Sequence, residues 1–223
     1  MRKGTINNYI NFSKSFGGVR KCYEGKPTIA VGGFMCDPKL MPTYPNVMQA
    51  GTLVYADETA GERKIIPVYT FKVLNVDALN KKVKVAKFET GSIAKVGMKL
   101  LVVGDDLNQA VANVATVTAI DSTAADFDIL TMDEVVANSS AFIVEGDVLA
   151  EAKSSEVKKI KAIPNGLTYC DNVLDPDAYA IDIDYIWNCM EKPVLERRMP
   201  PLTASLKKAL RDNECYFRFS NRK

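Results

Sequence analysis

The chain has 223 residues, of which 47% are hydrophobic and 25% charged, and its formal net charge is +2. This is the balance of a globular protein, and the small net charge gives no reason to expect nucleic-acid binding. The chain contains no histidine, which excludes Ser-His-Asp and Cys-His catalysis and the usual zinc sites that use histidine. No apolar run approaches the roughly 20 residues that span a bilayer, and the first residues lack a secretory signal, so we expect neither membrane association nor export by that route.

Residues 1–50 show little regular periodicity, because glycines and four prolines interrupt every short apolar run. A segment of this length without a core of its own is unusual inside a compact domain. We therefore predict an extended N-terminal arm that lies on a domain or on a neighbouring subunit. A disordered tail is the alternative, against which the aromatic residues count: Tyr9, Phe12, Phe16, Tyr23 and Phe34.

Residues 51–152 alternate between apolar and polar positions in short runs rich in β-branched residues and separated by turn residues. Alternation with period two is typical of strands with one buried face. We predict a small antiparallel β-barrel or sandwich here. The runs that carry this prediction are 53–55, 68–73, 82–88, 100–103, 115–120 and 127–130.

The same region contains a weak internal repeat. A strand end of the form V-x-x-[VI]-D begins at Val73 and again 44 residues later at Val117, and a glycine ahead of a Leu-containing strand occurs at Gly97 and 49 residues later at Gly146. A glycine before a strand suits a tight turn that needs a positive φ. Two such units closing on each other predict a pseudo-symmetric barrel without free edges.

Residues 153–166 are polar and end in the turn signal Pro164-Asn165-Gly166, which marks a boundary. Residues 203–211 have the pattern of a short amphipathic helix with Thr203 as its N-cap. We predict a C-terminal segment, 153–223, built as strand, helix and strand.

Its first strand, residues 179–187, alternates cleanly and places Asp182 and Asp184 on one face. The last strand, residues 215–219, is expected to pair with it. The opposite face of the first strand would carry Ile181, Ile183, Tyr185 and Trp187.

The cysteines are odd in number and no two have the C-x-x-C spacing of a zinc site, so we expect free, mostly buried thiols in a reducing cytosol. They are Cys22, Cys36, Cys170, Cys189 and Cys215.

Three groups of charged residues are candidates for a metal-binding, catalytic or partner-binding site. The pairs Asp57-Glu58 and Asp105-Asp106 lack the spacing of a calcium loop and suit hairpin tips in water. Asp182 with Asp184 could act as an acid–base pair, but a solvated strand face explains them more simply. A basic cluster without a nucleic-acid motif suits an acidic partner subunit or plain solvation: Arg197, Arg198, Lys207, Lys208 and Arg211. We predict no catalytic, cofactor-binding or metal-binding residues.

Several motifs together resemble capsid-associated structural proteins of tailed bacteriophages, of the head-fibre or capsid-decoration type. Among them are the Gly-Thr-Leu-Val-Tyr opening at Gly51, the Val-Gly-Met-x-Leu turn at Val96 and the Glu-Gly-Asp-Val-Leu ending at Glu145. The residues that carry the resemblance are 51–55, 72–77, 96–100, 117–131, 145–152 and 198–219.

The resemblance implies a non-enzymatic virion protein, made in the host cytoplasm and present on the capsid surface as a homo-oligomer or in many copies. Its partners would be the major capsid protein or other virion proteins, bound through the arm, the C-terminal segment or both. Two alternatives stay open. One is a carbohydrate-binding or adhesion module of a phage or cell-surface fibre, suggested by Tyr44, Tyr55 and Tyr69. The other is an enzyme that uses Asp182 with Asp184.

Overall fold

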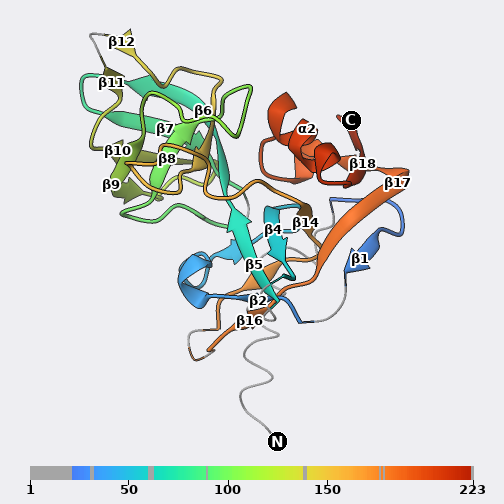
Figure 1. Cartoon of the computed structure of the whole chain (residues 1–223). Helices are drawn as coiled ribbons and strands as arrows, with labels where there is room; N and C mark the ends of the chain where they lie inside the picture. The colour runs from blue at the N-terminus through green and yellow to red at the C-terminus, as the bar shows by residue number, and fades with distance from the viewer. Residues whose placement is uncertain are drawn as a thin grey trace, which may run out of the picture.

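The computed structural model describes residues 22–30, 33–59, 63–88, 90–137, 140–175, 177 and 179–221. These residues form a mainly β protein with one α-helix, which confirms the predicted fold class. A closed barrel and a curved sheet lie against each other, and the helix lies beside both (Figure 1).

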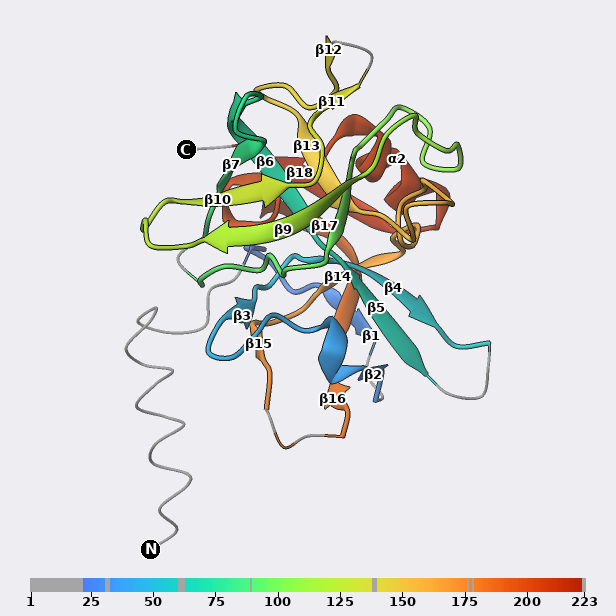
Figure 2. The same ribbon diagram turned by 90° about the vertical axis from the view of Figure 1, so that its left-hand side faces the viewer.

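The barrel consists of six antiparallel strands in the order β10-β7-β6-β13-β8-β9. Apolar residues at every second position fill its interior, among them Val83, Val85 and Leu130. Figure 2 shows β9 and β10 crossing its near side. The strands are β6 (Thr70–Asp77), β7 (Lys82–Ala86), β8 (Lys99–Val102), β9 (Ala115–Asp121), β10 (Phe127–Met132) and β13 (Val148–Glu151).

The two halves of the barrel are related by a pseudo-two-fold axis. If β6 is exchanged with β9, β7 with β10 and β8 with β13, the order of the strands around the closed barrel stays the same but runs in the opposite direction. The hydrogen bonds obey the same exchange: the Gly97 N–H donates to the Val117 carbonyl at 2.8 Å, and the Gly146 N–H donates to the Val73 carbonyl at 3.0 Å. These are the four residues that mark the repeat in the sequence, so the repeat corresponds to this symmetry.

The curved sheet has eight strands, in the order β1-β17-β14-β4-β5-β2-β16, with β18 also paired to β17. It combines strands from before, within and after the region predicted as the β-domain. The strands are β1 (Thr28–Ala30), β2 (Met35–Cys36), β4 (Leu53–Asp57), β5 (Lys64–Val68), β14 (Gly166–Thr168), β16 (Ile181–Asp182), β17 (Tyr185–Leu195) and β18 (Tyr216–Ser220).

Smaller elements complete the described fold. Strand β3 (Val47–Met48) pairs with β15 (Asn172–Val173), and β11 (Val136–Ala137) pairs with β12 (Ser140–Ala141). The 3-10 helices are η1 (Pro38–Leu40) and η2 (Glu196–Arg198).

The described part of residues 1–50 lies on the chain's own domain, which is one of the two placements predicted for it. Phe34, Cys36, Met41 and Met48 are each at most 1% exposed and belong to the same apolar cluster as the barrel interior. These residues are buried against strands that lie far away in the sequence, so this part of the segment belongs to the core and does not reach a neighbouring subunit. Residues 1–21 lie outside the described part of the chain.

The structure also divides the β region differently from the predicted 51–152 unit. The barrel begins at Thr70 and ends at Glu151. Strands β4 and β5, which precede it, pair within the curved sheet, where Val54 is opposite Gly166. The curved sheet is therefore completed by chain from both sides of the barrel.

The C-terminal helix α2 (Ala204–Asp212) begins as predicted, with the Thr203 side chain accepting a hydrogen bond from the Leu206 N–H. The last strand was predicted to pair with residues 179–187, but it pairs further along the chain. β18 runs parallel to β17, opposite Asn188, Cys189, Val194 and Leu195.

The predicted strand 179–187 is interrupted. Ile183 and Asp184 separate β16 from β17, and a bulge follows, since Thr28 of β1 is opposite Asn188 whereas Ile29 is opposite Ile186. Trp187 directly follows the buried Ile186, faces outward and is 38% exposed.

Candidate partner-binding surfaces

The two acidic pairs form exposed turns. The Asp57 carboxylate accepts hydrogen bonds from the Thr59 hydroxyl at 2.6 Å and the Thr59 N–H at 2.9 Å, and these bonds lower the pKa of Asp57. The Asp106 carboxylate accepts from the Asn108 N–H at 2.9 Å. Both are Asx-turns, which shape a loop without needing a ligand. Among the described residues, no group of three His, Cys, Asp or Glu side chains is placed to hold a metal ion.

Asp182 and Asp184 do not share a regular strand. Asp182 is opposite Met35 in the β16–β2 pair, whereas Asp184 lies in the link to β17, where its carbonyl accepts a hydrogen bond from Tyr169 N–H at 3.0 Å. Burial raises the pKa of Asp184, and the charge of Asp182 adds to this. The residue between them, Ile183, is fully buried.

All five cysteines are free, and all but Cys170 are buried, as predicted. Burial raises the pKa of Cys22 and of Cys36 to about 12, and that of Cys215 to about 11. Thiols with such pKa values are protonated at neutral pH and are poor nucleophiles.

Polar contacts from buried and half-buried side chains lie between the barrel and its connecting segments. Glu151, the last residue of β13, accepts a hydrogen bond from Lys161 Nζ at 2.8 Å. Lys95 Nζ donates to the Lys39 carbonyl at 2.8 Å, and Tyr69 Oη donates to the Leu40 carbonyl at 2.9 Å. These contacts hold η1 and the 153–161 segment against the barrel.

Tyr69 is therefore a buried structural residue, only 1% exposed, and not the exposed aromatic that the carbohydrate-binding alternative needs. Tyr55 is half-buried, and Tyr44 is 47% exposed.

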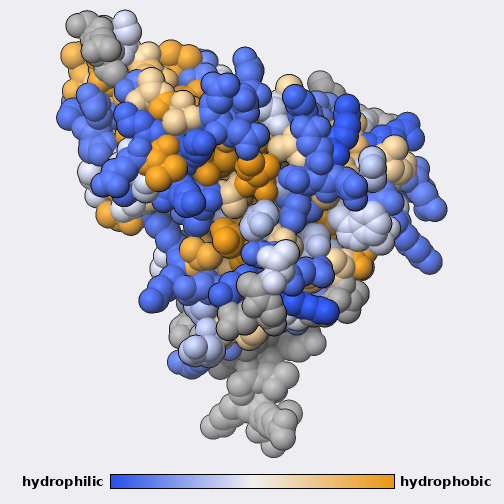
Figure 3. All heavy atoms as spheres, in the orientation of Figure 1, coloured by the Kyte–Doolittle hydropathy of each residue, from blue (hydrophilic) through white to orange (hydrophobic). Residues whose placement is uncertain are grey.

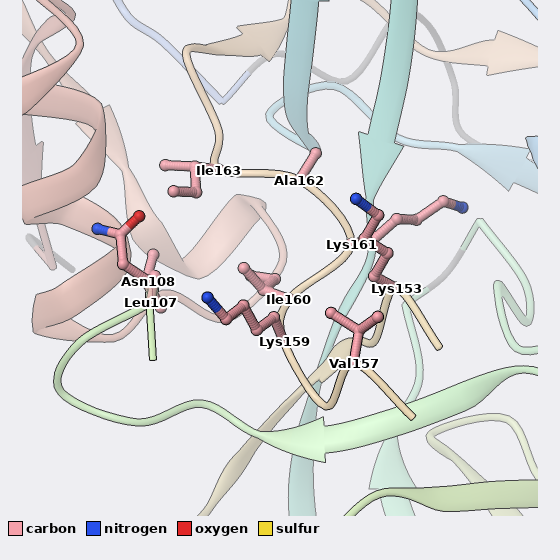
Figure 4. A pocket seen from close by; sticks show the side chains of 9 residues that line it. All are labelled: Leu107, Asn108, Lys153, Val157, Lys159, Ile160, Lys161, Ala162 and Ile163. Carbon is pink, nitrogen blue, oxygen red and sulfur yellow. The ribbon is translucent and has the colours of Figure 1, made fainter. Parts of the chain in front are cut away.

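A surface hollow of about 350 Å³ lies between two loops, one at residues 107–108 and the other at residues 153–163 (Figure 4). The aliphatic lining is formed by Leu107, Val157, Ile160, Ala162 and Ile163. Figure 3 shows hydrophobic residues between the barrel and α2, bordered by hydrophilic ones.

Three lysines line the same hollow. Lys159 extends toward the 107–108 loop, and Lys153 and Lys161 extend on the other side (Figure 4). Lys161 is paired with Glu151, whereas Lys153 and Lys159 are exposed. The hollow could not be predicted from the sequence. The polar composition of 153–159 indicates only a domain boundary, and part of the apolar lining comes from the 107–108 loop, 50 residues away in the sequence.

The basic cluster predicted from the sequence is spread over η2 and α2. Lys207 pairs with Glu196 at 2.8 Å and its ammonium group lies 5.4 Å from the centroid of the Phe219 ring. This contact fixes the helix to the sheet. Lys208 and Arg211 are exposed on the outer side of the helix.

A second exposed surface lies on β17 and β18. Trp187, Met190 and Tyr216 are 38%, 55% and 48% exposed. They gather around Asn188, which follows Trp187 and is opposite Tyr216 in the β17–β18 pair. We call this surface the Trp187 face.

Comparisons with known proteins add no assignment: no family model, no curated protein and no solved structure matches the chain. Within the described residues, no helix has the length and apolar character required to cross a membrane.

Proposed function

We propose that this chain is a non-enzymatic structural protein of a phage virion, which binds the outer surface of the capsid in many copies. The proposal starts from the resemblance of its motifs to head-fibre and capsid-decoration proteins. The structural observation that supports it best is the hollow, with its aliphatic lining and two exposed lysines, Lys153 and Lys159.

A hollow of this composition suits a protein surface that presents carboxylates beside an apolar side chain. Removing the aliphatic lining from water is favourable and stabilises the complex. The lysines favour a partner of negative charge and increase the rate of encounter. Each lysine at the rim of an interface contributes only modestly to the binding free energy. Repetition of the contact over a shell would turn this modest affinity into firm attachment.

The burial of Phe34, Cys36 and Met41 changes where the contact is expected. Residues 33–50 cannot leave the core to lie on a neighbouring subunit without exposing these side chains. We therefore assign the contact to the 153–163 loop and the exposed side of α2, together with residues 1–21, which contain five basic residues and no acidic one.

The test is co-sedimentation of the purified protein with capsids of its phage that lack it. The double variant Lys153→Glu/Lys159→Glu should bind at least about tenfold more weakly, because a charge reversal repels carboxylates at the same site. Lys72→Glu/Lys82→Glu is the matched control, since both lysines are exposed on the barrel outside the hollow. Equal binding by all three proteins would refute the assignment to the hollow, and no binding by the native protein would refute the proposal.

The carbohydrate-binding alternative has less support than the sequence suggests. Of the three aromatic residues behind it, Tyr69 is buried and Tyr55 is half-buried. A buried ring cannot offer its face to a ligand, whereas an exposed tyrosine offers both an apolar ring and a hydroxyl. A glycan array is the direct test, and reproducible binding that is lost in Tyr44→Ala would favour this alternative.

A further inference from the structure

The Trp187 face has the composition of a protein interface. Tryptophan, tyrosine and methionine are enriched at interfaces and are costly to leave in water. Other exposed apolar residues of the described chain occur singly, such as Leu79 and Val144 near turns and Met35 in β2. The Trp187 face instead gathers three of them on two adjacent, paired strands, at the side of the molecule away from the barrel (Figure 1).

The bulge in β17 is what creates this face. Ile186 and Cys189 are buried, at 0% and 2% exposure, so the two residues between them both turn outward. Without the extra residue, strict alternation from the buried Ile186 would place Trp187 outward and Met190 on the opposite side. The bulge thus brings Met190, and Tyr216 opposite Asn188, to the side of Trp187.

Charged residues of both signs lie beside the apolar centre. Arg218 lies on the same side of β18 as Tyr216, two residues away. Glu191 and Lys192 directly follow Met190, where the register of β17 against β18 shifts. All three are exposed, and none makes an ion pair within the described part of the chain. A partner of a single charge sign would leave one of these groups against a like charge.

We propose that two copies of this chain associate through the Trp187 face about a two-fold axis. Trp187, Met190 and Tyr216 form the centre, and Glu191 of each copy lies against Arg218 of the other. A two-fold interface brings the same patch of both subunits together, so a patch with an apolar centre and both charge signs at its edge is complementary to itself. This association does not depend on binding to a capsid.

Sedimentation velocity of the full chain tests the proposal. The mean mass should rise from one chain toward two as the concentration increases over about 1 μM to 1 mM, the range of weak specific interfaces. Because Trp187 is the only tryptophan of the chain, its fluorescence emission should shift to shorter wavelength over the same range. A protein that stays monomeric with unchanged emission would overturn the proposal, and an emission shift that requires added capsids would assign the face to the shell instead.

Variants locate the interface. Met190→Ala/Tyr216→Ala should weaken association by at least about tenfold, the effect of removing central contacts. Tyr179→Ala is the control, because Tyr179 is 97% exposed and lies outside the face. Circular dichroism and the unfolding midpoint verify that each variant is folded. Equal association by the double variant and the native protein would contradict the proposal.

Charge exchange tests the two-fold geometry. Glu191→Lys and Arg218→Glu should each weaken association, because each places like charges together across the axis. The combined variant Glu191→Lys/Arg218→Glu should recover most of the native affinity, because the pair is restored with its signs reversed. If the combined variant is as weak as the single ones or weaker, this pairing is refuted.

Discussion

Val83 and Leu130 are directly opposite each other in the β7–β10 pair, and both side chains are fully buried. Val83 is also opposite Val76, and Leu130 is opposite Ile120, which occupies the position of Val76 in the other half of the barrel. Val83 and Leu130 are therefore equivalent residues that meet on the pseudo-two-fold axis. Each half of the barrel buries its apolar face against the other half, so the two halves should fold together.

The paired glycines should be equally important to stability. Gly97 and Gly146 have φ values of 86° and 92°, in the region that other residues avoid, and neither has an atom within 4 Å of the place where a Cβ would stand. Gly97→Ala and Gly146→Ala should each lower the free energy of unfolding by about 1 kcal/mol through backbone strain alone. Urea denaturation measures this. Gly104→Ala is the control, because Gly104 has the same open space without a positive φ. A neutral effect at either paired site would contradict the symmetry of their roles.

Residues 33–50 should behave as part of the core. Phe34 is 1% exposed and its ring lies 5.0 Å from that of Tyr185 in an edge-to-face arrangement. Phe34→Ala should lower the free energy of unfolding by about 3 to 5 kcal/mol, since it leaves a cavity. The next residue, Met35, is 53% exposed, and Met35→Ala should cost less than about 1 kcal/mol. Similar, small effects of both changes in thermal unfolding would show that this segment is not part of the core.

The barrel and the helix could be predicted from the sequence because their signals are local. The alternation in β6, β7, β9 and β10 extends over five to eight residues, and the repeat marks both halves. The N-cap at Thr203 is also a local signal. Such patterns need no knowledge of distant contacts.

The curved sheet could not be predicted, because several of its strands are only two or three residues long and pair over large sequence separations. Leu167 of β14, for example, is opposite Leu53 of β4. Tyr69 was misjudged for a related reason: it lies where the chain passes from the sheet to the barrel, and its neighbours Val68 and Thr70 are buried as well. The surfaces proposed for binding depend on a bulge and on loops brought together by the fold, which leave no periodic signal.

The Glu151–Lys161 ion pair should contribute to the attachment of the 153–161 segment to the barrel. Both side chains are less than one-fifth exposed, and one Glu151 oxygen, Oε2, is buried without a hydrogen-bond partner. Lys161→Met should lower the free energy of unfolding by about 2 kcal/mol, because it leaves a half-buried carboxylate without its cation. In a double-mutant cycle, the loss should be smaller when Glu151 is already Gln. An additive result would show that the two groups act independently.

Stability should fall in alkali. Burial raises the pKa of the Cys22 thiol from an ordinary value of 9.0 to about 12. Above pH 9 the unfolded thiol loses its proton while the folded one keeps it, so the free energy of unfolding falls with rising pH until the folded thiol also ionises near pH 12. The slope approaches about 1.4 kcal/mol per pH unit for each such thiol.

Denaturation curves between pH 8.5 and pH 11 measure this slope, since this range covers about two of the pH units between the pKa of the unfolded thiol and that of the folded one. Cys22→Ala should reduce it by nearly the contribution of one thiol. Cys170→Ala should reduce it less, because Cys170 is only partly buried. A slope that is unchanged in Cys22→Ala would show that this thiol is not shielded from water in the folded protein.

Quantitative mass spectrometry of virions purified by density gradient tests the proposed function most directly. The account predicts that the chain is present in many copies per particle, in a fixed ratio to the major capsid protein, and that it is accessible to surface labelling of intact particles. Its absence from purified virions, in a host where the chain is shown to be expressed, would contradict the account.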